Sequence, residues 1–318
     1  MTITIRYYRD DDLDVIVDLT NAADAVDLLD EGTGIAELRE ILHRPGFDPR
    51  RDALVALDER QRIVGFARLE LKSGAQQTRL YVHTTVHPHW REKGVERLLL
   101  QRFRHTAQER RQILGSKPVQ FRTYCAAHQQ MRIALFESFG LRPVRYSPHM
   151  VCFSLDNLAD PRFPPGLEVR LYVRGQDDQS ALEAINEAFA DVMDFAPATL
   201  EGLRHWMASS SFREELSPVA LDGEVVVGLC LCTASDDGMR LMGRRDVYVD
   251  ALAVRPPYRR RGLGSALLLS SLHAMKEAGM ESASLDTDTD NLTEAIQLYE
   301  KVGFREAWRW VTYGKGIP

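Results

Sequence analysis

The chain has 318 residues, of which 44% are hydrophobic and 27% are charged, the proportions of a soluble globular protein. Its formal net charge of −6 argues against nucleic acid or an acidic membrane as a general partner. No apolar run approaches the ~20 residues of a membrane-spanning helix, and the first residues, MTITIRYYRDDD, lack the apolar core of a signal peptide. We therefore expect a cytoplasmic protein, and its length predicts two domains.

The two halves of the chain follow one plan, which indicates a tandem duplication. Four segments recur in the same order: residues 5–7 as 169–171, 55–58 as 219–222, 86–94 as 254–262, and 135–140 as 298–303. A proline-rich stretch, residues 156–166, lies between the copies. We predict an N-terminal domain over residues 1–155, a linker over 156–166 and a C-terminal domain over 167–318.

Within each copy, the residue pattern predicts the same succession of elements. An opening strand is followed by helices and by a hairpin around Asp58 in the first copy or Asp222 in the second. A further strand then ends in a loop, and a long helix, another strand, a helix and closing strands follow. This order predicts the α/β class, with a mixed sheet that binds its ligand at the C-terminal end of a central strand.

Two features of the first copy are not predicted to be functional sites. The three histidines within residues 83–89 look like metal ligands, but their counterparts in the second copy belong to a strand and its exit. The basic run over residues 91–111 predicts the solvated face of a helix, with Leu98, Leu99 and Phe103 turned inward. The four cysteines of the chain are expected to be core thiols.

Residues 247–272 of the second copy carry the most informative pattern. Residues 247–254 are apolar and β-branched enough for a buried strand, in which Asp250 is the acidic exception. Two prolines end this strand, and residues 259–264 read Arg-Arg-Arg-Gly-Leu-Gly. A helix is predicted from Ser265, with an apolar face that contains Leu268, Leu272 and Met275.

The loop between this strand and this helix is predicted to bind a phosphate. Glycines let successive backbone N–H groups turn inward, the helix adds its positive end, and the arginines add full charges. Gly264 is followed by Ser265 and Ala266, which excludes a Walker loop, and Leu267 stands where the dinucleotide fingerprint needs a third glycine. A tight glycine turn without a ligand is the alternative.

A second segment lies farther along the chain. Residues 284–288 look like a strand, Asn291 follows, and residues 298–304 read Leu-Tyr-Glu-Lys-Val-Gly-Phe. Together with Arg-x-x-Gly-x-Gly after a Val-x-Pro strand end, this order resembles the acetyl-coenzyme A site of the GNAT superfamily of N-acetyltransferases. The resemblance covers nearly the whole chain. It implies two tandem GNAT (acyl-CoA N-acyltransferase) domains, each a mixed, mostly antiparallel sheet flanked by helices.

The resemblance also implies how acetyl-CoA is held, without a metal. The basic loop would bind the pyrophosphate, and backbone groups at the strand end would pair with the pantetheine arm, beside which the asparagine would lie. The implied cofactor-binding residues are Leu252, Ala253, Val254, Arg259, Arg260, Arg261, Gly262, Leu263, Gly264, Ser265, Asn291 and Tyr299.

Acetyl transfer to an amine requires a base, because an ammonium group cannot attack a carbonyl. A carboxylate in a partly apolar cleft can take the proton. Asp250 is the first candidate and Asp246 the second, since the strand period puts both on one face. Many members of the resembled family have a glutamate base at the position of Tyr248, so the base stays open, and Asp250 could instead only orient a neighbouring loop.

The departing thiolate must gain a proton, and Tyr299 is predicted to supply it. A thiol has a pKa near ~8.5 and a phenol near ~10, so a tyrosine hydroxyl beside the sulfur can protonate the leaving thiolate. The resemblance implies the same role for this tyrosine. A core aromatic with a satisfied hydroxyl is the alternative.

The acceptor pocket is expected in residues 183–212, which precede the central strands. Acidic residues beside aromatic ones suit a cationic amine, although a surface helix pair would look similar. The candidate substrate-binding residues are Phe189, Asp191, Asp194, Phe195 and Trp206.

The two copies differ at the positions of the expected chemistry. Glu96 stands where the second copy has Gly264, and Phe136 and His128 stand where it has a tyrosine and an asparagine. We therefore predict that the first copy is degenerate. Because the counterparts of the first arginine and first glycine of the loop survive there, weak coenzyme A binding by that copy stays open.

These patterns predict an enzyme that transfers an acetyl group from acetyl-CoA to a primary amine of a small molecule by direct attack on the thioester. One alternative is an acetyltransferase that acts on protein or peptide N-termini or on lysine. Another is a non-catalytic acetyl-CoA-binding or interaction protein. We expect a monomer or a homodimer with no nucleic-acid or membrane partner.

Overall fold

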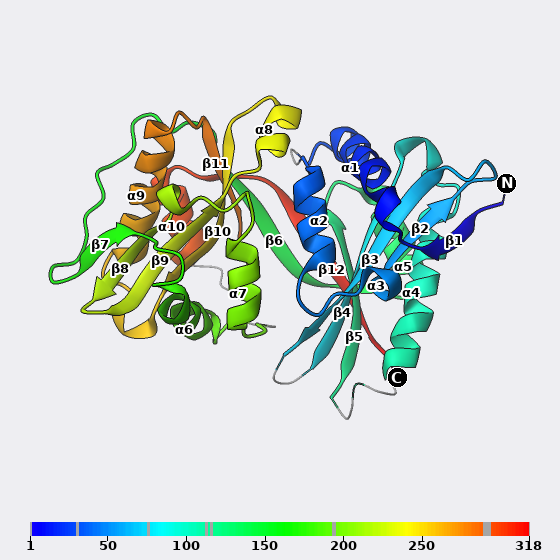
Figure 1. The fold of residues 1–318 in the computed structure, drawn as a ribbon, viewed down its shortest axis with the longest axis horizontal. Coiled ribbons are helices and arrows are strands. Elements are labelled where there is room, and N and C mark those ends of the chain that lie inside the picture. The colour runs from blue at the N-terminus through cyan, green and yellow to red at the C-terminus, as the bar shows by residue number, and fades with distance from the viewer. Residues whose placement is uncertain are drawn as a thin grey trace. The chain divides into compact units, whose positions relative to one another are not determined.

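The computed structural model describes residues 2–29, 32–74, 77–111, 114, 117–192, 195–288 and 294–317. The chain forms two compact units: the first contains the chain up to Tyr146 and its last residues from Trp310, and the second contains Ser147–Arg309. Each unit is a sheet with helices packed on it (Figure 1). Among the described residues, no helix is both long enough and apolar enough to cross a membrane.

The sheet of the first unit has the strand order β1-β2-β3-β4-β5-β12. Its neighbouring strands are antiparallel except β4 and β5, which are parallel. The elements up to the end of the first repeat are β1 (Thr4–Tyr7), α1 (Leu13–Asp27), α2 (Ile35–His43), α3 (Pro49–Asp52), β2 (Ala53–Leu57), β3 (Ile63–Ser73), β4 (Thr78–Val86), α4 (Val95–Arg111), β5 (Val119–Ala126), α5 (Gln130–Ser138) and β6 (Arg142–Cys152).

The sheet of the second unit has the corresponding order β7-β8-β9-β10-β11-β6, with β10 and β11 as its parallel pair. Both sheets are thus mixed and mostly antiparallel, as predicted. The elements of the second repeat are β7 (Glu168–Leu171), α6 (Asp178–Phe189), α7 (Leu200–Met207), β8 (Pro218–Asp222), β9 (Val225–Thr233), α8 (Asp236–Met242), β10 (Asp246–Val254), α9 (Leu263–Glu277), β11 (Ser282–Asp286), α10 (Glu294–Val302) and β12 (Arg305–Ile317).

The boundaries of the compact units differ from those of the sequence repeats, by part of one strand in each repeat. The end of β6 belongs to the first repeat, but its residues from His149 pair with β11 in the second unit. The chain's last strand belongs to the second repeat, but from Trp310 to Ile317 it pairs with β5 in the first unit. The stretch over residues 156–166 has turns but no helix or strand, and it lies within the second unit.

Each sheet buries apolar side chains on both faces. In the first unit, one core lies under α4 and α5 and another under α1 and α2; in the second unit, α9 and α10 cover one core and α6 and α7 the other. The predicted apolar face of α9 is confirmed, since Leu268, Leu272 and Met275 are fully buried. The prediction that Leu98 faces inward is wrong: it is 38% exposed, because α4 meets the sheet through Leu99 and Phe103, four residues apart.

A glycine in each sheet lets the long helix of the same unit come close. A Cβ atom added at Gly228 in β9 would lie 2.9 Å from a methyl carbon of Leu267 and 3.1 Å from one of Leu263. In the first unit, a Cβ at Gly65 would lie 2.8 Å from a methyl carbon of Val95. The helix that follows the loop is therefore seated directly on the sheet in both copies.

The parallel strands of the second unit separate partway along their length. β10 pairs with β11 only from Asp246 to Tyr248, which lies opposite Ser284. β10 then continues to Val254, paired with β9 alone, and a β-bulge interrupts that pairing between Val249 and Ala251. Within the described residues, no strand pairs with this other edge of β10 beyond Tyr248. This separation positions the candidate site.

We predict that Gly228→Val destabilises the protein by about 1–3 kcal/mol, because the added methyl groups would displace α9 from the sheet. The matched control is Gly316→Val on β12, where an added Cβ meets no atom within 4 Å. Urea unfolding of both variants measures the difference. Equal stability of the two variants would contradict this account of how α9 is seated.

Candidate active site

The loop between β10 and α9 has the backbone of an anion-binding turn. A short 3₁₀ turn, Pro256–Tyr258, ends the strand, and Arg260 and Gly262 then have positive φ angles of 62° and 82°. The first intrahelical hydrogen bond of α9 runs from the Ala266 N–H to the Gly262 carbonyl, at 3.0 Å. The amides of the preceding residues therefore have no partner within the helix and are available to an anion.

The first arginine of this loop is fixed by the end of α6. The Arg259 guanidinium donates to the backbone carbonyl of Ala188 at 2.8 Å and lies 3.6 Å from the Asp191 carboxylate. Asp191, which the sequence suggested for the acceptor pocket, lies beside the loop between β10 and α9, with a side chain that is 81% exposed. Arg260 and Arg261 are exposed.

Gly264 lies where the end of β10 approaches α10. A Cβ atom added there would lie 3.3 Å from a methyl carbon of Leu298 and 3.7 Å from one of Val254. A longer side chain at this position would fill the space next to the free amides. A ligand with a pyrophosphate and an extended chain would suit this arrangement. The turned loop and Gly264 leave room for the pyrophosphate, and the extended chain could lie along the unpaired edge of β10.

Tyr299 lies on α10, directly after Leu298, whose side chain packs next to Gly264. Its side chain is partly buried against the core under α9 and α10, with its ring 6.0 Å from that of Phe304. Burial, with a further contribution from Cys230, raises the pKa of the Tyr299 phenol above its ordinary value. The phenol is therefore protonated at neutral pH.

The two candidate bases have different surroundings. Asp250 is exposed at the β-bulge and accepts a hydrogen bond from the Thr233 hydroxyl at 2.7 Å. Asp246 is 8% exposed and accepts hydrogen bonds from the hydroxyls of Ser282 and Ser284, the latter at 2.5 Å. These contacts favour a structural role for Asp246 and leave Asp250 as the accessible carboxylate. Tyr248 lies between them on β10, opposite Thr233.

The aromatic candidates for the acceptor pocket fall into two groups. The rings of Phe189 and Phe195 lie 6.1 Å apart, and both are partly exposed. Trp206 packs against Phe212, with centroids 5.2 Å apart, and contributes to the core under α6 and α7. Two other predicted residues, Asp194 and Asn291, lie outside the described residues.

The first unit has the same loop backbone but different side chains at its end. Glu92 and Gly94 have φ angles of 61° and 81°, which match those of Arg260 and Gly262. Arg91 forms an ion pair with Asp27 at 2.7 Å, as its counterpart Arg259 does with an aspartate at the end of α6.

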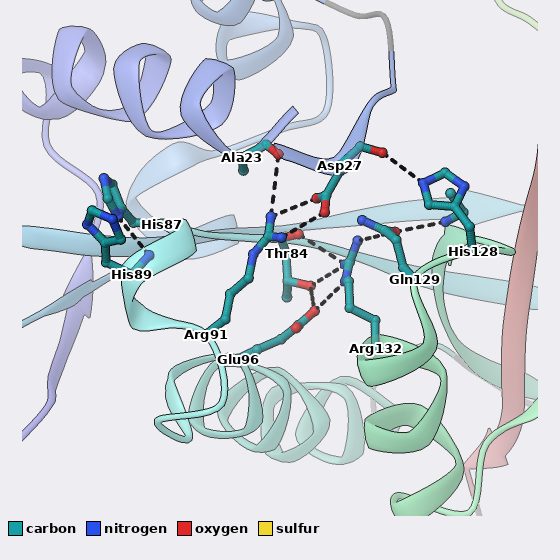
Figure 2. A network of polar contacts seen from close by, with 11 residues as sticks. Ala23, Asp27, Thr84, His87, His89, Arg91, Glu96, His128, Gln129 and Arg132 are labelled. Atoms are coloured by element: carbon teal, nitrogen blue, oxygen red, sulfur yellow. Dashed lines mark hydrogen bonds and ion pairs between the residues drawn. The ribbon is translucent and has the colours of Figure 1, made fainter. Parts of the chain in front are cut away.

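Figure 2 shows how side chains fill the separation between β4 and β5 in this unit. Arg132 donates to the backbone carbonyl of Thr84 at 3.1 Å, to the Thr84 hydroxyl at 3.0 Å and to the Glu96 carboxylate at 2.9 Å. The Thr84 hydroxyl donates to Glu96 at 2.7 Å, and Arg132 also reaches Gln129. Thr84 is the counterpart of Leu252, so Arg132 occupies the strand edge that is unpaired in the second unit.

A polar pair on the second unit's sheet was not apparent from the sequence. His149 on β6 lies opposite Asp286 on β11, and its Nδ1 is 2.8 Å from a carboxylate oxygen of Asp286. The two residues are 137 positions apart, and only the strand register brings them together. Asp286 is the last residue of β11 but His149 lies within β6, so no common pattern marked the pair in the sequence. Among the described residues, no cluster of histidine, cysteine, aspartate or glutamate has the composition of a metal site.

Known proteins share this sequence pattern and this fold. Residues 181–304 match the family model described as Acetyltransferase (GNAT) family. A mycothiol acetyltransferase from Pseudarthrobacter chlorophenolicus is 30% identical over 235 residues, which cover 72% of this chain and 68% of that protein.

Two solved structures match nearly the whole chain. A GCN5-related N-acetyltransferase from Sphaerobacter thermophilus has a TM-score of 0.77 and 25% identity, and the match covers 99% of this chain and 96% of that one. A tandem GNAT protein from the clavulanic acid biosynthesis pathway has a TM-score of 0.74 and 16% identity, over 100% and 99% of the two chains. The predicted tandem fold is confirmed. The chain belongs to the GNAT family of acetyltransferases and is homologous to the mycothiol acetyltransferases.

Proposed function

We propose that the second copy transfers an acetyl group from acetyl-CoA to a primary amine of a small molecule, and that the first copy does not bind acetyl-CoA. The observation that carries this proposal is the contrast at one position. Gly264 leaves the free amides of α9 accessible, whereas Glu96 places an ion-paired carboxylate at the same point of the first copy.

The residues that bind acetyl-CoA follow from that contrast. The arginines Arg259–Arg261 and the amides at the start of α9 neutralise the pyrophosphate. The edge of residues 252–254 that β11 leaves unpaired, where the Val254 carbonyl accepts from Arg259 at 3.2 Å, hydrogen-bonds the pantetheine arm. Asn291 is proposed to lie beside this arm. Acetyl-CoA supplies a thioester whose carbonyl carbon is open to attack by an amine.

The acceptor side of the reaction involves the exposed face of β10. The Asp250 carboxylate attracts the acceptor's ammonium group, and it is the first candidate to take the proton. The neutral amine forms the new C–N bond, and its nitrogen releases the excess proton to solvent as the amide forms. The C–S bond breaks, and the Tyr299 hydroxyl gives its proton to the departing thiolate. Solvent then restores the proton of Tyr299.

A small-molecule acceptor is favoured over a protein or peptide because the relatives named above are mycothiol acetyltransferases, named for a small molecule. The aromatic pair Phe189 and Phe195 is proposed to line the acceptor pocket, and Trp206 to support it from the core. A panel of free amines and peptides separates the two classes, since an enzyme for peptides would leave the free amines unmodified.

We predict that Gly264→Glu abolishes acetyl-CoA binding, because the carboxylate would repel the pyrophosphate and fill its space. Calorimetric titration should show about one site per chain in the unmodified protein and none in the variant. Gln297→Glu on α10 is the matched control, since it adds the same charge at an exposed position and should bind normally. A site that survives Gly264→Glu would show that the first copy binds acetyl-CoA after all.

We predict that Tyr299→Phe lowers the turnover number roughly 10- to 10⁴-fold while acetyl-CoA affinity is unchanged, because only the proton donor is lost. Tyr7→Phe, at a side chain that is 42% exposed in the first unit, is the control. Steady-state kinetics with saturating acetyl-CoA measure the effect. An unchanged turnover number would remove Tyr299 from the mechanism.

We predict that Arg132→Leu destabilises the protein by roughly 2–4 kcal/mol, because it leaves Glu96 without its ion-pair partner. The double variant with Glu96→Leu should recover much of this loss, since no unpaired charge remains. Arg97→Leu, on an exposed part of α4, is the control. Urea unfolding of the set forms a double-mutant cycle, and additive losses would contradict a coupled pair.

A further inference from the structure

The His149–Asp286 pair lies on the same face of the second sheet as the candidate base. Ser284 is on that face, because its hydroxyl reaches Asp246 in β10. Asp286 follows two residues later in β11, so it returns to the same face, and His149 is its partner in β6. Both residues therefore project from the face that carries Asp250.

The pair also lies at the level where β10 and β11 separate. The last residues that the two strands pair are Tyr248 and Ser284. Two residues beyond them, Asp250 stands on the β10 side of the separation and Asp286 on the β11 side. The two carboxylates thus flank the place where the proposed function puts the thioester.

The histidine is held in one orientation. His149 is 5% exposed, and its ring stacks on Trp308 with centroids 4.6 Å apart and an angle of 18° between the planes. Its Nδ1 is bonded to Asp286, whose side chain is 32% exposed. Within the described part of the chain, the ring makes no second hydrogen bond, so Nε2 is the nitrogen left for a bound molecule.

The acidic side chains of this part of the sheet differ in their surroundings. Asp286 accepts from Nδ1–H, and Asp250, on the same face of the sheet, accepts from the Thr233 hydroxyl. Asp288, farther along from β11, is buried, and Asp246 is compensated by Arg244 at 3.7 Å and by two serine hydroxyls. Histidine is also the side chain whose proton exchange is best matched to neutral pH.

We propose that His149 accepts the proton of the acceptor's ammonium group at Nε2, with Asp286 as the positioning residue that holds the imidazole in the Nδ1–H form. This inference rests on the proposed function and leaves Asp250 to pair with the ammonium. The ammonium N–H proton passes to Nε2, and the freed electron pair forms the C–N bond with the thioester carbonyl. The C–S bond breaks, and the nitrogen releases its second proton to solvent as the amide forms. Tyr299 protonates the thiolate and is reprotonated by solvent, which later also takes the proton from His149.

The test compares His149→Gln and Asp286→Asn with the control His273→Gln, which changes a partly exposed histidine of α9 that contacts the Ala159 carbonyl. Turnover number and KM are measured from about pH 5 to pH 9, and calorimetry confirms acetyl-CoA binding. We expect His149→Gln to lower the turnover number 10²- to 10⁴-fold and to remove the fall in rate toward acidic pH. Asp286→Asn should lower it at least tenfold with little change in KM, whereas Asp286→Glu should restore part of the rate.

Different failures have different meanings. If the unmodified protein acetylates no amine, the proposed function fails. If it does so and both His149→Gln and Asp286→Asn keep its turnover number and pH profile, the role of His149 is overturned. The same holds if Asp250→Asn alone removes the acidic limb of the profile. Should His149→Gln not fold, Asp286→Asn still decides, because its side chain is partly exposed and the substitution preserves its shape.

Discussion

The separation of β10 from β11 is the constraint on which the rest of the second unit depends. Buried backbone N–H and C=O groups need partners, and beyond Tyr248 the edge of β10 has none in the sheet. An extended ligand arm can supply them, as an added strand would. The loop with Gly262 and the start of α9 lie at the end of that same edge, so one strand end presents both a row of hydrogen-bonding groups and an anion site.

In the first unit, side chains of the protein itself supply hydrogen bonds to the corresponding strand edge. Arg132 bonds the Thr84 carbonyl on the corresponding edge, and Glu96 balances the arginine's charge. An internal ion pair thus supplies hydrogen bonds to the edge of β4 at Thr84. The φ angles of Glu92 and Gly94 match those of Arg260 and Gly262, so the loop backbone is the same in both copies although the side chains beside it differ.

Local patterns in the sequence predicted what local physics determines. The run of residues 259–264 predicted the turned loop, and helical spacing predicted the buried face of α9 at Leu268 and Leu272. Contacts that depend on the register between neighbouring strands could not be predicted from the sequence. The serine contacts that occupy Asp246 and the pairing of His149 with Asp286 both require knowing which residues lie opposite each other on neighbouring strands. No spacing rule gives that information for residues 137 positions apart.

The exchange of strand ends gives a physical reason for keeping a first copy whose cofactor position is filled. The second unit's sheet has β6 as its neighbour to β11, and β6 comes from the first repeat. The first unit's sheet has the chain's last strand as its neighbour to β5. Neither repeat alone contains all the strands of one sheet, so deleting the first would expose the edge of β11 and remove His149. Selection can therefore discard acetyl-CoA binding by the first copy while it retains the strand that the second unit needs.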